Sequence, residues 1–177
     1  MDETNIEALA LPSADPALDP RVYFARLLDS CPEFAHLKDG EANVAWFMRA
    51  DVFVQAGRMI LGMVHLPKVQ GRLNALFLWM LNSLHGSQPD FIVILDAVWW
   101  GQASEREREI LVYHETCHMI QAEDKDGEPK FDDDTGRPVF ALAGHDVEEF
   151  SAVVRRYGAW NDDILAFQQA LQEGNDQ

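Results

Sequence analysis

The apolar residues along the chain follow two spacings, one typical of helices and one typical of strands. In residues 73–85 (LNALFLWMLNSLH), large apolar side chains recur every three or four positions, which predicts an amphipathic helix. Runs of β-branched and aromatic residues at 59–69 and 90–100 predict two strands. A weaker signal of the same kind, AWFMRADVFV, predicts a strand beginning near residue 45.

Two other helices have clear start signals. Asp19 followed by Pro20 has the pattern of an N-cap and first helical residue, which predicts a helix over about 20–29. Ser104 and Glu107 have the spacing of a capping box. We therefore expect a second helix from about 104 to 122.

The region after this helix is predicted to form a small hairpin and then two helical segments. Turn residues at 126–127 and 134–136 separate two short arms, 130–133 and 138–142. A final helical region is predicted to begin at His145. Together these elements predict an α+β fold, a small twisted mixed sheet with helices packed on it.

Length and composition favour one globular domain. We expect a mobile acidic arm over 1–19, a single domain over 20–172 and a frayed tail over 173–177. The chain has 177 residues, 47% of them hydrophobic, but its apolar runs are too short for a membrane span and its N-terminus lacks a secretory pattern. Two cysteines, Cys31 and Cys117, make no disulfide framework, so a cytoplasmic location is expected.

The net charge narrows the range of partners. At −16, the chain would repel a phosphate backbone, which makes nucleic acid an unlikely partner. The sequence does not indicate an oligomeric state.

The stretch YHETCHMI (113–120) contains the candidate metal-binding and catalytic residues. On a helix, residues four apart lie on the same face, so His114 and His118 present two imidazoles to one point. This is the HExxH pattern, in which two neutral imidazoles bind Zn²⁺ and the glutamate, here Glu115, serves as general base. A catalytic zinc requires a third protein ligand and one open position.

Several downstream residues are candidates for the third ligand. His145, in GHDVEEF, is favoured because imidazole is a common zinc ligand. The carboxylates of Glu148 and Glu149 are alternatives, and Asp146 is a weaker one. If His145 binds the metal, Glu149 lies about one turn further on and could orient a ligand from outside the coordination sphere.

HETCH resembles the zincin metallopeptidases, in which a strand precedes the HExxH helix and the sheet commonly lends an edge strand to an extended peptide substrate. GHDVEEF and VVRRYGAW resemble the putative phage metallopeptidase family and, more loosely, SprT-like zinc proteases. The resemblance covers about residues 44–160. It implies a zincin-like fold in which His114, His118 and His145 bind zinc and Glu115 is catalytic. The chain lacks the basic extension and cysteine-rich ribbon of SprT-like proteins, which argues against DNA-linked substrates.

We therefore expect zinc-dependent hydrolysis of peptide bonds, with Tyr157 as a candidate donor to the oxyanion. Two alternatives stay open. One is a non-catalytic zinc-binding interaction module, phage or mobile-element encoded, that acts on a host protein. The other is a metal-dependent hydrolase with a non-peptide substrate, although no phosphate-cradling glycine loop favours phosphoester chemistry.

Overall fold

The computed structural model describes residues 8–51, 54–55, 57–145 and 149–175. By the density of backbone contacts the chain divides into two compact units, Met1–Ala143 and Gly144–Gln177. The single domain over 20–172 stays a prediction.

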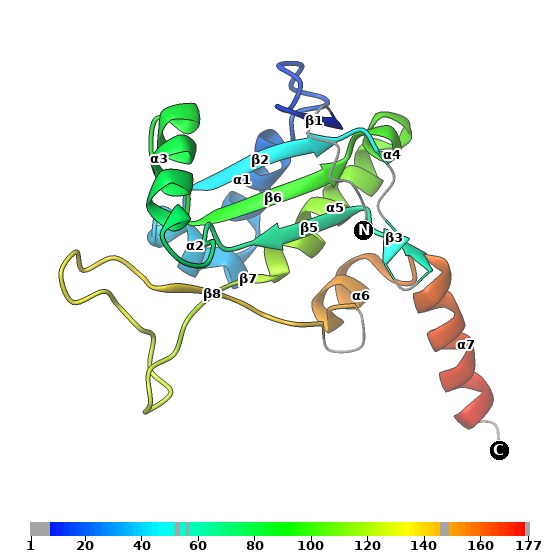
Figure 1. Ribbon diagram of the computed structural model, residues 1–177. Helices are drawn as coiled ribbons and strands as arrows, with labels where there is room; N and C mark the ends of the chain where they lie inside the picture. The colour runs from blue at the N-terminus through cyan, green and yellow to red at the C-terminus, as the bar shows by residue number, and fades with distance from the viewer. Residues whose placement is uncertain (1–7, 52–53, 56, 146–148, 176–177) are drawn as a thin grey trace. The chain divides into compact units, whose positions relative to one another are not determined.

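The first unit is built on a mixed sheet (Figure 1) of four strands in the order β1-β2-β6-β5. These strands are β1 (Leu9–Ala10), β2 (Val44–Arg49), β6 (Phe91–Asp96) and β5 (Gly62–His65). β2 and β6 are parallel, whereas β1 and β5 run antiparallel to their neighbours. The predicted α+β class with a small mixed sheet is confirmed. Leu9 and Ala10, which lie in the predicted arm, pair with β2, and the mobility of the arm stays a prediction.

Alternation of side chains along the strands gives the sheet two differently covered faces. One face carries Trp46, Val93 and Leu95, which are at most 3% exposed. Helices α1 (Pro20–Ser30) and α5 (Glu105–Cys117) lie along the sheet and pack on each other, and Phe24 of α1 contacts the ring of Trp46.

On the opposite face, α3 (Leu73–His85) covers part of β2 and β6. Leu81 packs with Ala45 and Ile92, and Phe77 lies against the same cluster. Most of the remaining large side chains of α3 are exposed.

Short elements complete the chain. The first unit also contains η2 (Pro32–Phe34), α2 (Ala35–Asp39), β3 (Val54–Gln55), β4 (Arg58–Met59), α4 (Ala97–Gln102), β7 (Met119–Gln121) and β8 (Phe140–Leu142). The second unit contains α6 (Ser151–Tyr157) and α7 (Asp162–Asn175). The frayed tail over 173–177 stays a prediction. Within the described residues, no helix combines the length and apolar character needed to cross a membrane.

The predicted helices over 20–29 and 73–85 are confirmed, with Asp19 accepting a hydrogen bond from the Arg21 amide as N-cap. Two of the predicted strands were too long. The strand expected over 59–69 is confined to β5 and the end of β4. The strand expected over 90–100 stops at Asp96, because its carboxylate accepts a hydrogen bond from the Trp99 amide and caps α4 instead.

The boundaries near the histidines also differ from the predictions. The helix expected to reach 122 ends at Cys117, because the next residues pair with β8 as strand β7. β8 pairs with β7 at the base of this region. The predicted arms 130–133 and 138–142 meet in a short antiparallel pairing at Phe131 and Pro138, where the Val139 amide donates to the Lys130 carbonyl. The helix expected to begin at His145 begins at Ser151.

Candidate metal centre

The HExxH segment lies at the C-terminal end of α5, a helix with a firmly fixed beginning. The Ser104 hydroxyl accepts a hydrogen bond from the Glu107 amide, and the Glu107 carboxylate accepts one from the Ser104 amide. This confirms the predicted capping box. The Ser104 hydroxyl also donates a 2.6 Å hydrogen bond to the Glu107 carboxylate. This bond, followed by the one from the Ser104 amide, lowers the pKa of Glu107. The cap sets the first residue of α5 and holds its first turn in place.

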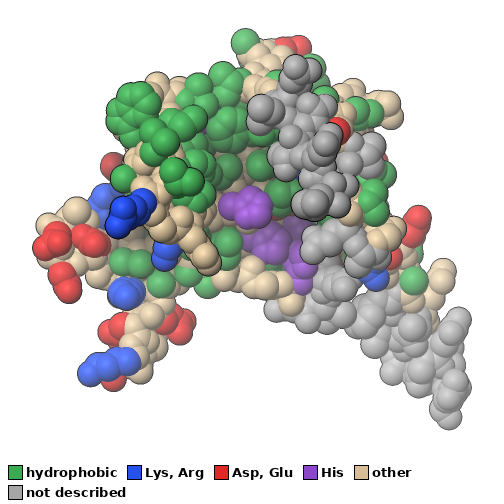
Figure 2. Space-filling view, in the orientation of Figure 1, with side chains coloured by type: hydrophobic (Ala, Val, Ile, Leu, Met, Phe, Trp, Pro, Cys, Tyr) green, Lys and Arg blue, Asp and Glu red, His purple; other side chains and the backbone are tan. Residues whose placement is uncertain are grey.

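The two histidines of the motif face each other across one helical turn. Their ring centroids are 5.2 Å apart with the planes inclined by 76°. His118 caps the helix but keeps helical dihedral angles, φ −71° and ψ −20°, so the four-residue spacing still brings the two rings together. Both side chains are partly buried. Histidine side chains also gather at the surface in the space-filling view (Figure 2), with hydrophobic side chains around them.

The tautomer of His118 is set by the backbone. Its Nδ1 lies 2.8 Å from the carbonyl oxygen of Ala143, which can only accept, so Nδ1 carries the proton and donates. In the neutral ring Nε2 then keeps its lone pair for a metal. The amide of Ala143 in turn donates to the His118 carbonyl over 2.9 Å. This pair of hydrogen bonds fixes the ring orientation in the way that metal-binding histidines usually require.

Glu115 points away from solvent toward the sheet. It is 2% exposed, and its carboxylate lies against Gly62 at the start of β5. A Cβ atom built on Gly62 would be 2.3 Å from Glu115 Oε1 and 2.7 Å from Cδ. The Glu115 carboxylate is therefore held between α5 and β5.

The residue before the motif anchors the helix from the other side. Tyr113 is 1% exposed and donates a 2.6 Å hydrogen bond to Oε1 of Glu33. Burial, followed by this hydrogen bond, raises the pKa of Tyr113 far above its ordinary value. Its ring also packs edge-on against Phe34. The helix is thus locked in rotation, which keeps the histidines on the outer side.

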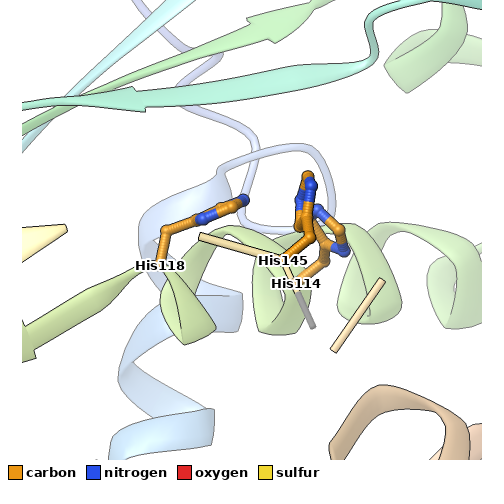
Figure 3. Close-up of side chains that lie close together, drawn as sticks. All are labelled: His114, His118 and His145. Atoms are coloured by element: carbon orange, nitrogen blue, oxygen red, sulfur yellow. The ribbon is translucent and has the colours of Figure 1, made fainter. Parts of the chain in front are cut away.

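His145 is the second residue of the Gly144–Gln177 unit and is exposed. One ring nitrogen from each of His114, His118 and His145 forms a group whose members all lie within 4.8 Å of one another. Figure 3 shows these three side chains together. Three imidazole nitrogens at this spacing are suited to a divalent metal that prefers nitrogen ligands.

The remaining predicted site residues have other surroundings. Asp146 and Glu148 lie outside the described residues. Glu149 is buried, and its two carboxylate oxygens accept hydrogen bonds from the Phe150 amide and the Trp160 indole. These bonds tie its carboxylate to its own unit. Tyr157 ends α6, where its hydroxyl oxygen accepts a hydrogen bond from Arg156 Nε, and its role as an oxyanion donor stays a prediction.

Two contributors to the site were not found from the sequence. Gly62 acts through the space it leaves and Ala143 through its backbone, so neither carries a reactive side chain. A glycine inside the predicted strand over 59–69 was the available signal for Gly62, since such glycines often mark a close approach of another group. No sequence signal identifies the Ala143 carbonyl.

An α+β domain whose HExxH helix lies beside a mixed sheet, with three histidines able to hold a metal, has the features of a metallopeptidase. The family model for the putative phage metallopeptidases matches residues 17–168. The chain therefore belongs to that family, as the resemblance of its histidine motifs implied. Searches of the curated proteins and of the solved structures found no match to the chain.

Proposed function

We propose that this protein is a zinc metallopeptidase in which His114, His118 and His145 bind the metal and Glu115 is the general base. The observation that carries the proposal is the hydrogen bond from His118 Nδ1 to the Ala143 carbonyl. It leaves Nε2 as a ligand atom and holds the ring facing His114. A surface histidine with no ligand role would not need this orientation.

The chain itself limits where His145 can lie. Ala143 is hydrogen-bonded to His118 in both directions, and His145 is only two residues further on. Two extended residues span at most about 7 Å. The backbone of His145 therefore stays close to the histidine pair, which supports it as the third ligand over the carboxylate of Glu149.

The proposed reaction is hydrolysis of a peptide bond. Bound zinc would polarise the scissile carbonyl and lower the pKa of the attacking water. Glu115 accepts the proton of that water and passes it to the leaving amine. Glu115 is 2% exposed, so its carboxylate is shielded from bulk water where it would act.

An extended peptide is the substrate shape that the sheet favours. Within the described residues, β5 is an edge strand of the sheet: one of its sides pairs with β6, and its other side pairs with no strand of that sheet. It also packs against α5. A peptide added to this edge as a further strand would pass alongside the histidine pair.

Glu115→Gln tests the role of the base. The change removes the proton acceptor and keeps the size of the side chain. We expect peptide hydrolysis to fall by at least a hundredfold, measured with an unfolded protein as substrate and one equivalent of zinc, with metal content unchanged by elemental analysis. Loss of zinc in this variant would reassign Glu115 as a ligand.

His145→Ala tests the ligand set, with His65→Ala as its control because His65 is an exposed histidine on β5. We expect His145→Ala to lose most of its bound zinc and the control to keep it. Equal zinc content in both variants would exclude His145.

Full zinc binding by the wild type without cleavage of any peptide would favour the non-catalytic interaction module, and cleavage of other amides alone would favour the non-peptide hydrolase.

A further inference from the structure

The backbone of β5 comes unusually close to the Glu115 side chain at Gly62. A Cβ atom at this position would lie 2.3 Å from Oε1, 2.7 Å from Cδ and 3.1 Å from Cγ of Glu115. The first two separations are below the 3.0 Å limit that real Cβ contacts respect. The outer half of the glutamate side chain therefore occupies the volume that any side chain at 62 would fill.

Backbone conformation does not explain the glycine. The described glycines with positive φ are Gly57, Gly71, Gly86, Gly127, Gly136 and Gly158. Gly62 is not among them, so an L-residue could adopt its dihedral angles. What the position requires is the absence of a side chain.

The two backbones at this contact are held in place. Gly62 pairs with Leu95 of β6, and the carbonyl of its neighbour Leu61 accepts a 2.8 Å hydrogen bond from the Asp96 amide. On the other side, Glu115 extends from the part of α5 where Val112 and Thr116 are fully buried. Neither β5 nor α5 can retreat without breaking pairing or core packing. The glutamate side chain, with its rotatable bonds, is the part that can move.

We propose that Gly62 is a positioning residue for Glu115: it leaves open the space in which the carboxylate is held against the β5 edge, and so fixes where the base acts. The inference rests on the proposed role of Glu115 as general base. A side chain at 62 would push the carboxylate to another rotamer and leave the histidines untouched. The base and the metal ligands are thus positioned by different contacts, Gly62 for one and Ala143 for the other.

The experiment is Gly62→Ala in two backgrounds, wild type and Glu115→Ala. Gly101→Ala is the matched control, because Gly101 also lacks a positive φ and a Cβ there would meet nothing within 4 Å. We expect Gly62→Ala to lower kcat at least tenfold, with KM and zinc content close to wild type. The control should leave all three unchanged.

A second measurement does not depend on activity. Urea unfolding of the metal-free proteins should show a lower midpoint for Gly62→Ala in the wild-type background. In the Glu115→Ala background the interfering atoms are gone, so the same change should lower the midpoint less or not at all. This difference between backgrounds is the coupling that a double-mutant cycle measures.

The outcomes separate this inference from the proposed function. An unchanged kcat for Gly62→Ala, or an equal shift of the urea midpoint in both backgrounds, would overturn the positioning role. If the wild-type protein cleaves no peptide, the proposed function fails, while the double-mutant cycle still decides whether Gly62 sets the place of the Glu115 carboxylate.

Discussion

The sequence of α3 is more hydrophobic than that of α5, yet α3 is the more exposed of the two helices. α3 contains no Asp, Glu, Lys or Arg, whereas α5 begins with five consecutive charged residues. Yet α3 buries one residue, Leu81, and exposes several large apolar ones, while α5 buries six residues in its second half. The exposed apolar residues of α3 are Leu73, Leu76, Trp79, Met80 and Leu84.

The difference comes from how the two faces of the sheet are covered. α5 packs with α1 over one face, so the apolar residues in the second half of its sequence are enclosed on all sides. α3 contacts part of the other face through a small cluster around Leu81. Overall hydrophobicity therefore does not tell how deeply a helix is buried. What matters is how many of its neighbours pack around it.

The largest loss in the free energy of unfolding is expected for a substitution on the buried side of α5. Leu111 is 3% exposed, and Leu111→Ala should destabilise the protein by about 2–5 kcal/mol, because it removes packed methyl groups and leaves a cavity. Urea unfolding of the metal-free protein measures this. A loss below about 1 kcal/mol would mean that the α5 interface is looser than its burial indicates.

A smaller loss in the free energy of unfolding is expected for substitutions at the N-caps of α5 and α3. Ser104 caps α5 with its side chain, whereas Arg72, at the same position of α3, makes no capping hydrogen bond. Ser104→Ala should cost about 1 kcal/mol. Arg72→Ala should change the free energy of unfolding little, and it serves as the control. Rescue by Ser104→Asp would confirm that capping is responsible.

Acid should weaken the same cap. The pKa of Glu107 is lowered in the folded protein by its hydrogen bonds to Ser104, so the folded state holds the proton less tightly than the unfolded state. The cap then contributes stability above the ordinary glutamate pKa of about 4.3 and loses it as the pH falls through the lower, folded value. The difference in thermal midpoint between wild type and Ser104→Ala should accordingly shrink between pH 5 and pH 3. A constant difference would contradict this role of Glu107.

The smallest effect is expected on the open side of α3. Leu76 is 52% exposed, and Leu76→Ala should change stability by no more than about 0.5 kcal/mol. This is the same substitution as Leu111→Ala, so the two variants compare position alone. An equal loss at both sites would show that the exposed face of α3 is covered in solution.

The sequence predicted the parts of the molecule that depend on near neighbours. His114 and His118 are one helical turn apart, and Ser104 and Glu107 have capping spacing, so local geometry was enough to place them. Features that depend on distant residues were missed. The early end of α5 arises from pairing of Met119 with Leu142, and the role of Gly62 arises from the sheet register, neither of which leaves a pattern in a single stretch.

The long segment between β7 and β8 has a consequence for how the protein can vary. β7 and β8 pair, and the two hydrogen bonds between His118 and Ala143 close this loop at its base. Residues 123–139 can therefore be shortened, lengthened or exchanged without changing the distance between the two anchoring residues. A change in the length of this projection would leave the histidine pair intact.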